Sequence, residues 1–574
     1  MEKETQIIRT ALPSDLDAIA AVEAECFPAA EAATKEEFAG RLAHYADHFW
    51  LMFEGGRLIS FVDGFVTDCP DLTDEMYADA DLHNESGAWQ MIFGVNTILS
   101  RRGRGCAGRL IRRAISDARS QGRKGLVLTC KEEKIGYYAK FGFVDEGVSP
   151  NSTHGGVVWH QMRLTFRKGL VLFPGDEATQ QRLMDAAGPA CEFVFREPGW
   201  TAEEYHHALK TANILIGEPK NEDLALCENL ELMQSPSSGV NYYVQGGTFP
   251  KNATLCCMTG GYGNILAEHL LGMVLSLCRR LPEYRDQQHE HKWQLLKYDK
   301  QLEGSTLLIL GAGDIGTTVA KWMRPMVGKI IGVRRRAREF PDCYDEMLTL
   351  AELDDRLGEA DIIVCALPHT PETVHLLNEE RLRKIKKDAV LVNGGRGSLI
   401  DQEALCALLD EGRFWGVGLE VADPEPLPAD DPLWAQPRVL ITPHAAGNSF
   451  APGSPLERKI WEFIIENIGG YLHGKEAKNQ VDFAMGYRKT GFRCCRAACP
   501  QAAGQATKRN GKTGAGRLQI CHPERAKRVE GSTQGIPAKQ CDRAQILRLR
   551  ASHSAQDDIL FLHTVYGKIF AVEQ

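Results

Sequence analysis

The sequence predicts a multidomain α/β protein, in which a mixed-sheet domain precedes two doubly wound, parallel-sheet domains and a C-terminal tail of low order. Strands alternate with helices from about residue 168 to residue 485, a pattern typical of parallel α/β architecture. Two glycine-rich turns, near residues 103 and 311, each follow an apolar strand and open a helix. After residue 485 no period of 2 or 3.6 persists, and the segment offers little from which to build a core.

The composition is that of a globular protein. Of 574 residues, 43% are hydrophobic and 25% are charged. The sequence has neither a signal-like start nor an apolar run of the ~20 residues that cross a bilayer. Its 17 cysteines lack a repeated spacing, which favours reduced thiols over a disulfide framework. We therefore expect a cytoplasmic protein without a membrane partner.

The net charge of −9 is unevenly distributed along the chain. From Arg488 onward there are 16 Lys and Arg against 6 Asp and Glu, so the preceding residues carry −19. Binding to a phosphate backbone requires a basic surface, which an acidic body does not provide. Nucleic acid is therefore not an expected partner of the main body.

The first glycine-rich turn spans residues 101–108, with the sequence RRGRGCAG. It follows MIFGVNTIL, which we predict to be one strand, and opens the helix GRLIRRAISDAR, whose N-terminus can hold a pyrophosphate. A dinucleotide site would need an acidic residue about 20 residues later. The next strand, GLVLTC, is instead followed by Lys131, so the turn favours a different phosphate ligand.

Together with YYAKFGF at 137–143, this turn resembles the GNAT acetyltransferase superfamily over roughly residues 5–165, nearest its arylalkylamine-type members. The resemblance implies acetyl-CoA as cosubstrate and an amine as acceptor, and gives Tyr138 the protonation of the departing CoA thiolate. The alternative interpretations are purely structural: the glycine turn only caps the helix, and Tyr138 only packs against its neighbours. The residues that the resemblance assigns to acetyl-CoA binding are Arg102, Gly103, Gly105, Ala107 and Gly108.

The second glycine-rich turn, Gly311-Ala312-Gly313-Asp314-Ile315-Gly316, follows the strand STLLIL and opens the helix TTVAKWMRPM. With the later strand KIIGV, it predicts a Rossmann-like domain that binds a nicotinamide dinucleotide. Where an acidic residue would bind the ribose hydroxyls, the sequence has Arg334-Arg335-Arg336. Arginine pairs well with a 2′-phosphate, so NADP(H) is favoured over NAD(H). A solvated loop is the alternative explanation of the arginines.

Three polar residues follow apolar strands further along the chain: Arg396, Glu425 and His444. Ligands of doubly wound sheets bind at the carboxyl ends of the strands, so we expect the three to share one site. Arg396 can hold a carboxylate and polarise a carbonyl, while His444 exchanges a proton with the carbonyl oxygen. Glu425 would pair with the imidazole and favour its protonated form. The set predicts hydride transfer between 2-oxo and 2-hydroxy acids.

The motifs LLILGAGDIG, ALPHTPET, NGGRGSLID, EPLP and TPHAAG, in this order, resemble the D-isomer-specific 2-hydroxyacid dehydrogenases over residues 168–485. The resemblance implies a substrate domain of 168–270 plus 448–485, a cofactor domain of 271–447 and a homodimer formed through this part. Glu420 and Arg334 each replace a usual Asp, which loosens cofactor placement and alters cofactor choice. The further residues implied are Leu367, Pro368, Thr370 and Glu420 for the cofactor, and Ser238, Gly239, Tyr262 and Gly263 for the substrate.

The sequence thus predicts a bifunctional fusion. An N-acetyltransferase domain, residues 1–166, precedes a dehydrogenase that resembles glyoxylate and hydroxypyruvate reductases. Two alternatives stay open: the first domain is a degenerate acyl-CoA-binding module that regulates the dehydrogenase, or the chain is a non-enzymatic sensor. No metal site is expected, because His206-His207 and His289-Glu290-His291 lack a second ligand pair.

The tail, residues 486–574, holds five of the 17 cysteines, without a Cys-x-x-Cys pair. Phrases such as CHPERAKRVEGS resemble translated bacterial intergenic repeat, and we interpret the tail as the product of read-through. A nucleic-acid-binding arm is the functional alternative. We expect deletion after Tyr487 to leave dehydrogenase activity intact.

Overall fold

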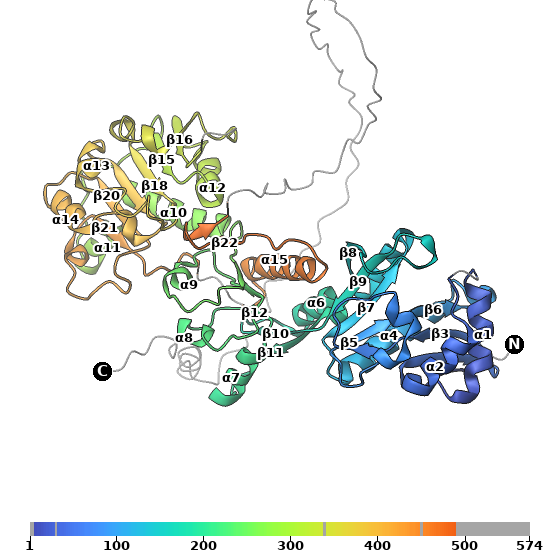
Figure 1. The fold of residues 1–574 in the computed structure, drawn as a ribbon. Coiled ribbons are helices and arrows are strands. Elements are labelled where there is room, and N and C mark those ends of the chain that lie inside the picture. Colours follow the sequence, from blue (N-terminus) through green and yellow to red (C-terminus); the bar gives the residue numbers. More distant parts are fainter. Residues whose placement is uncertain (1–4, 29–30, 337–339, 448–451, 490–574) are drawn as a thin grey trace, which may run out of the picture. The chain divides into compact units, whose positions relative to one another are not determined.

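The computed structural model describes residues 5–28, 31–336, 340–447 and 452–489, which form mixed and parallel sheets covered by helices (Figure 1). The multidomain α/β class predicted from the sequence is confirmed. Among the helices of these ranges, none is both long enough and apolar enough to cross a membrane. The interpretations of the tail fall outside the described residues, except for residues 486–489.

Two sheets make up the first part of the chain. The four-stranded sheet, with the order β1-β2-β3-β6, is antiparallel throughout. The five-stranded sheet has the order β4-β5-β7-β9-β8, in which β5 and β7 run parallel. The elements are β1 (Gln6–Thr10), α1 (Leu16–Cys26), α2 (Lys35–Tyr45), β2 (Phe49–Glu54), β3 (Arg57–Asp63), β4 (Val66–Thr67), α3 (Glu75–Ala78), β5 (Trp89–Ile92), β6 (Gly94–Thr97), α4 (Cys106–Ser120), β7 (Gly125–Cys130), α5 (Ile135–Tyr138), β8 (Val144–Val148) and β9 (His160–Thr165).

The predicted strand MIFGVNTIL is broken in the structure. β5 ends at Ile92 and β6 begins at Gly94, and the two strands belong to different sheets. Because they diverge at Phe93, the chain from Ile92 to Val95 lines an opening. Periodicity in a short apolar run does not reveal which neighbour each residue pairs with, so the sequence did not predict this break.

The next sheet is parallel and has the order β11-β10-β12-β13-β14, so its first strand lies second in the sheet. This is one of the two common doubly wound arrangements. The elements of this part are β10 (Arg167–Val171), α6 (Glu177–Ala187), β11 (Cys191–Phe195), α7 (Ala202–Thr211), β12 (Ile214–Ile216), α8 (Asn221–Leu224), β13 (Leu232–Gln234), α9 (Asn241–Gln245) and β14 (Thr254–Cys256).

Helix α15 (Pro455–Leu472) returns to this early segment. Nε1 of the buried Trp461 donates to the carbonyl oxygen of Pro174 (2.9 Å), and Nδ2 of Asn467 donates to Oε1 of Gln234 (2.7 Å). Segments far apart in the sequence therefore pack together, as a discontinuous substrate domain requires. The domain boundaries themselves stay a prediction.

The seven-stranded sheet is parallel and has the order β17-β16-β15-β18-β19-β20-β21. The strand order reverses between β15 and β18, where dinucleotides bind in this architecture. Its central strands are buried, which explains their continuous apolar runs. The elements are α10 (Gly263–Cys278), α11 (Leu281–His289), β15 (Thr306–Leu310), α12 (Asp314–Met323), β16 (Lys329–Val333), β17 (Glu346–Leu348), β18 (Ile362–Cys365), α13 (Glu379–Lys384), β19 (Val390–Asn393), α14 (Gln402–Asp410), β20 (Gly416–Leu419) and β21 (Val439–Ile441), followed later by the hairpin β22 (Val481–Asp482) and β23 (Tyr487–Arg488).

Candidate active sites

The turn at 311–316 joins β15 to α12 and depends on its glycines. Gly311 has φ 105°, and a Cβ on Gly311 would lie 2.6 Å from the carbonyl oxygen of Ala366. On Gly316 a Cβ would lie 2.2 Å from the carbonyl oxygen of Gly311. The helix can therefore begin close to the strand, with its first N–H groups directed at a ligand. The predicted cradle for a dinucleotide pyrophosphate fits this geometry.

The three arginines after β16 line a cavity of about 260 Å³ together with the glycine turn. Nη2 of Arg334 donates to the carbonyl oxygen of Ala312 (3.0 Å), and Nε of Arg335 lies 3.6 Å from Oε2 of Glu372. Guanidinium groups in this place suit an anionic group on the cofactor. Leu367, Pro368 and Thr370 line the same cavity.

A second cavity, of about 360 Å³, adjoins the same turn and is lined by His444, one member of the predicted acid–base pair. Nδ1 of His444 lies 2.8 Å from Oε2 of Glu425, while Oε1 of Glu425 accepts from the backbone N–H of Ala422 (3.1 Å). Partial burial acts to raise the pKa of the Glu425 carboxyl, but the hydrogen bond and charge of His444, the Ala422 N–H and the charge of Arg396 together lower that pKa. His444 lines the cavity with φ 52°, in the left-handed region that few side chains adopt.

Arg396 lines this cavity as well. Its Nη1 donates to the carbonyl oxygen of Gly395 (2.7 Å). A Cβ on Gly239 would lie 1.6 Å from Nη2 of Arg396, so only glycine leaves room for the guanidinium. Burial lowers the pKa of Arg396, against the charges of Glu425 and Tyr487. The substrate loop and the arginine thus lie against each other at this cavity.

The other residues predicted to bind the dehydrogenase substrate lie in two different positions. Ser238 and Tyr262 line the cavity, and the Tyr262 hydroxyl donates to the carbonyl oxygen of Pro236 (2.9 Å). Gly263 begins α10, where a Cβ would lie 2.8 Å from the carboxylate of Asp314. Gly263 therefore permits close packing beside the glycine turn.

Glu420 is buried in the cavity wall and held by protein groups. Its Oε2 accepts from the Thr442 hydroxyl and lies 3.0 Å from Nε2 of His269, and its Oε1 accepts from the N–H of Ala446. These contacts fix the carboxylate. The predicted contact with the cofactor stays a prediction.

Residues 486–489 also line the cavities, which the sequence did not indicate. Gly486 to Arg488 line the larger cavity, and Tyr487 to Lys489 line the smaller one. Burial raises the pKa of Tyr487, and a hydrogen bond with Thr259 acts in the opposite direction. The antiparallel pairing of β22 and β23 turns the chain back to this place. No sequence motif near these residues predicts that the chain turns back to the cavities.

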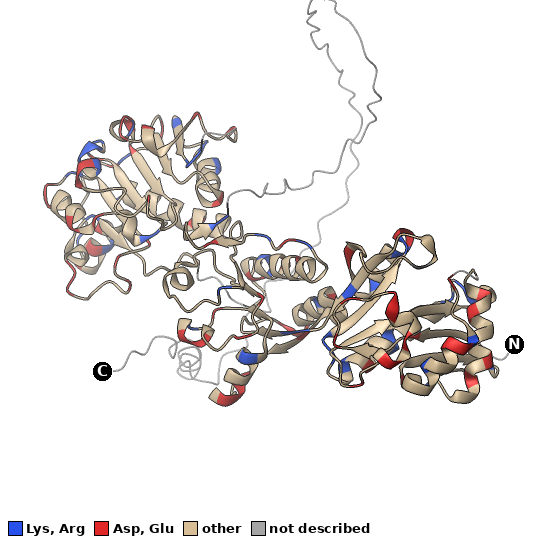
Figure 2. Ribbon diagram, viewed as in Figure 1, with Lys and Arg blue, Asp and Glu red and all other residues tan. Residues whose placement is uncertain are grey.

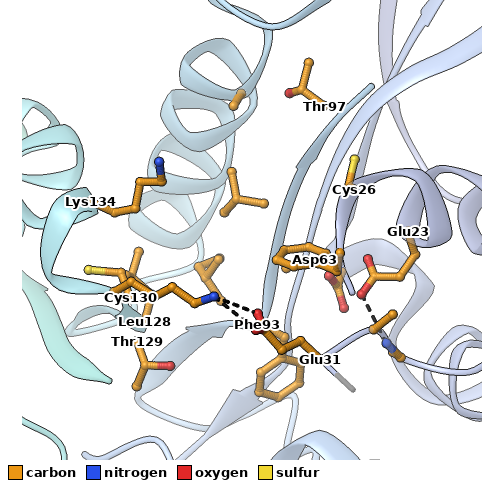
Figure 3. A pocket seen from close by; sticks show the side chains of 18 of the residues that line it. Glu23, Cys26, Glu31, Asp63, Phe93, Thr97, Leu128, Thr129, Cys130 and Lys134 are labelled. Atoms are coloured by element: carbon orange, nitrogen blue, oxygen red, sulfur yellow. Dashed lines mark hydrogen bonds and ion pairs between the residues drawn. The ribbon is translucent and has the colours of Figure 1, made fainter. Parts of the chain in front are cut away.

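The first glycine turn opens a third cavity, of about 880 Å³, at the divergence of β5 and β6 (Figure 3). Gly103 and Gly105 have φ 76° and 79°, which suit glycine, and Gly105 caps α4. Arg102 and Ala107 line the cavity beside them. Gly108 instead packs on Phe141, whose Cζ would lie 3.1 Å from an added Cβ.

Tyr138 lines the same cavity from α5. Burial raises the pKa of its hydroxyl, and Cys130, Tyr137 and Tyr77 act in the same direction. The hydroxyl is therefore protonated at neutral pH, as a proton donor must be, although its raised pKa makes it a weaker acid than an ordinary tyrosine.

His48, His83 and Glu85 form a cluster with ligand-like spacing in the described part of the first domain. Both Nε2 atoms face Oε2 of Glu85, at 2.9 Å from His48 and 3.3 Å from His83. The backbone N–H of Val66 donates to Nδ1 of His83 (3.2 Å), which leaves the proton on Nε2, and Nη2 of Arg123 lies 2.7 Å from Oε1 of Glu85. These contacts favour a hydrogen-bonded network over a bound cation.

Family models match two parts of the chain. Residues 271–446 match the D-isomer specific 2-hydroxyacid dehydrogenase NAD binding domain, and residues 7–144 match an acetyltransferase (GNAT) domain. A curated relative from Corynebacterium melassecola, described as an uncharacterized protein in the proB 3′ region, is 31% identical over 274 residues. The match covers 46% of this chain and 85% of the relative.

Solved structures resemble the same part of the chain. A D-isomer specific 2-hydroxyacid dehydrogenase family protein from Aeromonas salmonicida is 33% identical, covering 55% of this chain and 99% of its own, with a TM-score of 0.49. A D-isomer specific 2-hydroxyacid dehydrogenase from Xanthobacter autotrophicus, solved with NADPH and MES, is 27% identical, covering 56% and 99%, with a TM-score of 0.48.

The seven-stranded sheet and its glycine turn are those of a dinucleotide-binding dehydrogenase. More particularly, the chain belongs to the D-isomer-specific 2-hydroxyacid dehydrogenase family, and a GNAT acetyltransferase domain precedes the dehydrogenase part. Both family assignments made from the sequence are confirmed.

Tyr487→Ala should lower kcat/KM for 2-oxo acid reduction at least about tenfold, equivalent to 1.4 kcal/mol, because it removes a wall of both cavities. Steady-state kinetics measure this. Phe483→Ala, on the same hairpin but 39% exposed, is the matched control. Because Arg488 and Lys489 line the smaller cavity, the truncation is placed after Lys489 instead of after Tyr487, and it should leave kcat/KM unchanged. Equal activity of Tyr487→Ala and wild type would contradict this role.

Proposed function

We propose that the dehydrogenase part interconverts 2-oxo acids and D-2-hydroxy acids with NADP(H), and that glyoxylate and hydroxypyruvate are among its substrates. The observation that carries the proposal is the 2.8 Å contact between Glu425 and His444, whose side chain lines a cavity with Arg396 and residues 313–315 of the dinucleotide turn. A panel of 2-oxo acids, assayed by NADPH oxidation, tests it. We further propose a homodimer formed through this part, which sedimentation of the full chain tests.

Each residue of the site has a distinct role in this proposal. When bound, the reduced nicotinamide supplies a hydride to the carbonyl carbon. Arg396 binds the substrate carboxylate and polarises the carbonyl. His444 donates a proton from Nε2 to the carbonyl oxygen, and accepts it in the reverse direction. Glu425, whose carboxyl pKa is lowered, stays ionised and stabilises the imidazolium through Nδ1.

The proposed preference for NADP(H) rests on the arginines after β16. Arg334, Arg335 and Arg336 line the cavity beside the glycine turn, and no carboxylate stands at the first position after the strand. A 2′-phosphate can accept several charge-assisted hydrogen bonds from such a group, whereas ribose hydroxyls need an acceptor.

We propose a second activity for the first domain, transfer of the acetyl group from acetyl-CoA to an amine. The observation that favours it is a cavity in which the glycine turn of α4 and the Tyr138 hydroxyl meet. The turn would hold the CoA pyrophosphate at the helix N-terminus. Tyr138 would protonate the CoA thiolate as it leaves.

His444→Ala should reduce kcat by roughly 10²–10⁴, because general acid catalysis is lost. The dissociation constant of NADPH should stay unchanged, as measured by fluorescence titration, since the arginines and the glycine turn are intact. Comparable turnover of the mutant and wild type would exclude His444 as the proton donor.

Arg334→Asp combined with Arg335→Ser should weaken NADPH binding by at least about tenfold, because charge-assisted contacts of about 1.5–3 kcal/mol are lost. NADH binding should change much less, and titration of both cofactors measures the ratio. Arg383→Ser, on the exposed face of α13, is the control. A wild-type preference for NADH would show that the loop arginines do not bind a 2′-phosphate.

Tyr138→Phe should slow acetyl transfer by about 10² or more, the usual contribution of a general acid. Acetyl-CoA binding should persist, because only a hydroxyl is removed. Tyr137→Phe, with the neighbouring ring in the same cavity, should slow transfer much less. Unchanged transfer in Tyr138→Phe, measured where chemistry limits the rate, would show that another group protonates the CoA thiolate.

A further inference from the structure

A buried carboxylate faces the cavity of the first domain. Glu23, on α1, is 6% exposed and lines the cavity (Figure 3). Its Oε1 accepts from the backbone N–H of Ala33 (3.1 Å). Its Oε2 is buried and has no hydrogen-bond partner within the described ranges. Such an oxygen is costly to leave unmatched, and an unmatched acceptor inside a cavity suits a ligand that donates.

The buried Asp63 and the partly buried Glu31, which line the same cavity, already have cationic partners. Oδ2 of Asp63, on β3, lies 2.9 Å from Nη1 of Arg41, on α2. Both carboxylate oxygens of Glu31 lie 3.0 Å from Nζ of Lys131. Figure 2 shows acidic residues on α1 and α2. Both helices contribute residues to the lining of the cavity. Of these three carboxylates, Glu23 is the one that forms no ion pair within the described residues.

Two further acidic residues line the cavity, but neither combines burial with an unmatched carboxylate oxygen as Glu23 does. Glu37 closes the capping box with Thr34, where its Oε2 accepts from the Thr34 N–H (2.6 Å). Glu133 is exposed, so water solvates its charge. A cationic ligand in the cavity therefore meets one buried carboxylate, that of Glu23, with an oxygen that has no hydrogen-bond partner among the described residues.

We propose that Glu23 binds the ammonium group of the acetyl acceptor and removes its proton, and that the acceptor is a primary monoamine with an apolar body. The inference rests on the proposed acetyltransferase function. One buried carboxylate without an ion-pair partner matches one ammonium group, so the second charge of a diamine would have no buried carboxylate to pair with. Phe27, Phe93 and Trp159 line the same cavity and can bury an apolar body.

The protonation behaviour of Glu23 fits a base. Burial and the charge of Asp63 raise the pKa of the Glu23 carboxyl to about 7, while the Ala33 N–H, Arg41 and Asn96 act in the opposite direction. A general base works best when its pKa lies near the working pH.

The proposed step is balanced as follows. The ammonium R–NH₃⁺ gives one proton to Glu23, and the amine lone pair attacks the thioester carbon, forming the C–N bond. The C–S bond then breaks, and the CoA thiolate takes the Tyr138 proton. The second nitrogen proton restores the tyrosine hydroxyl, and Glu23 releases its proton to solvent. The products are the acetamide, CoA-SH and one proton.

Glu23→Gln in the full chain should lower kcat/KM for 2-phenylethylamine by about 10²–10⁴, as expected for loss of a general base. In wild type, kcat/KM should fall below pH about 7, and this acidic limb should disappear in Glu23→Gln. Acetyl-CoA binding should be unchanged in calorimetric titration. Glu25→Gln, the same change on the same helix outside the cavity, should keep the wild-type profile. 1,4-Diaminobutane should be a poorer acceptor than 2-phenylethylamine at least about tenfold.

Thermal stability gives a readout that does not depend on activity. A carboxyl whose folded-state pKa lies above its ordinary value of 4.5 contributes stability below that value, and loses it as the pH rises through about 7. The Tm of wild type should therefore fall relative to the Tm of Glu23→Gln as the pH rises from 5 to 8. Glu25→Gln should follow wild type.

The outcomes separate the two proposals. If wild type binds acetyl-CoA but acetylates no amine, the proposed acetyltransferase function fails, and the role of Glu23 fails with it. If wild type is active and Glu23→Gln keeps both its rate and the acidic limb, only the role of Glu23 is overturned. Equal use of diamine and monoamine would overturn the assigned acceptor class.

Discussion

A Cβ on Gly316 would lie 2.2 Å from the carbonyl oxygen of Gly311, so α12 can begin this close to β15 only with glycine at that position. The close approach leaves the first N–H groups of α12 directed at the point where the strand order reverses. The same turn brings Ala312 to Arg334, whose guanidinium donates to its carbonyl oxygen. The rest of the dehydrogenase site is arranged around this turn, because parallel strands place their carboxyl ends, and the loops that follow them, along one edge of the sheet.

The parts of the molecule that the sequence predicted correctly are those determined locally. A glycine turn between an apolar strand and a helix is contiguous in the chain, so its residues carry the whole signal. Capping boxes are also formed by residues close together in the sequence: in the structure, Thr34 with Glu37 and Thr201 with Glu204 begin α2 and α7. Thr349 forms the same box, yet only the 3₁₀ turn Leu350–Glu352 follows. A cap stabilises the first turn, whereas a longer helix also needs an apolar face that packs.

The features that the sequence did not indicate depend on contacts between distant segments. Glu23 stands out because Arg41 is engaged by Asp63, a pairing 22 residues apart, while Glu31 is engaged by Lys131, 100 residues away. Tyr487 reaches the dehydrogenase cavities only because a short hairpin turns back toward them. Neither the periodicity nor the spacing of side chains records which charges neutralise each other, so tertiary structure is needed to show which carboxylate is left over.

Two glutamates show how surroundings assign chemistry to one side-chain type. Glu425 is partly buried, but His444 lies 2.8 Å from it and lowers its carboxyl pKa, so the group stays ionised and can stabilise a cation. Glu23 is more deeply buried, next to the like charge of Asp63, and the pKa of its carboxyl rises to about 7. It can therefore exchange a proton near neutral pH. The difference arises from burial and from the partner: Glu425 has an imidazole within hydrogen-bonding distance, whereas the more deeply buried Glu23 has an unmatched carboxylate oxygen. Exchanging the two environments would exchange the two roles, because neither role is encoded by the glutamate itself.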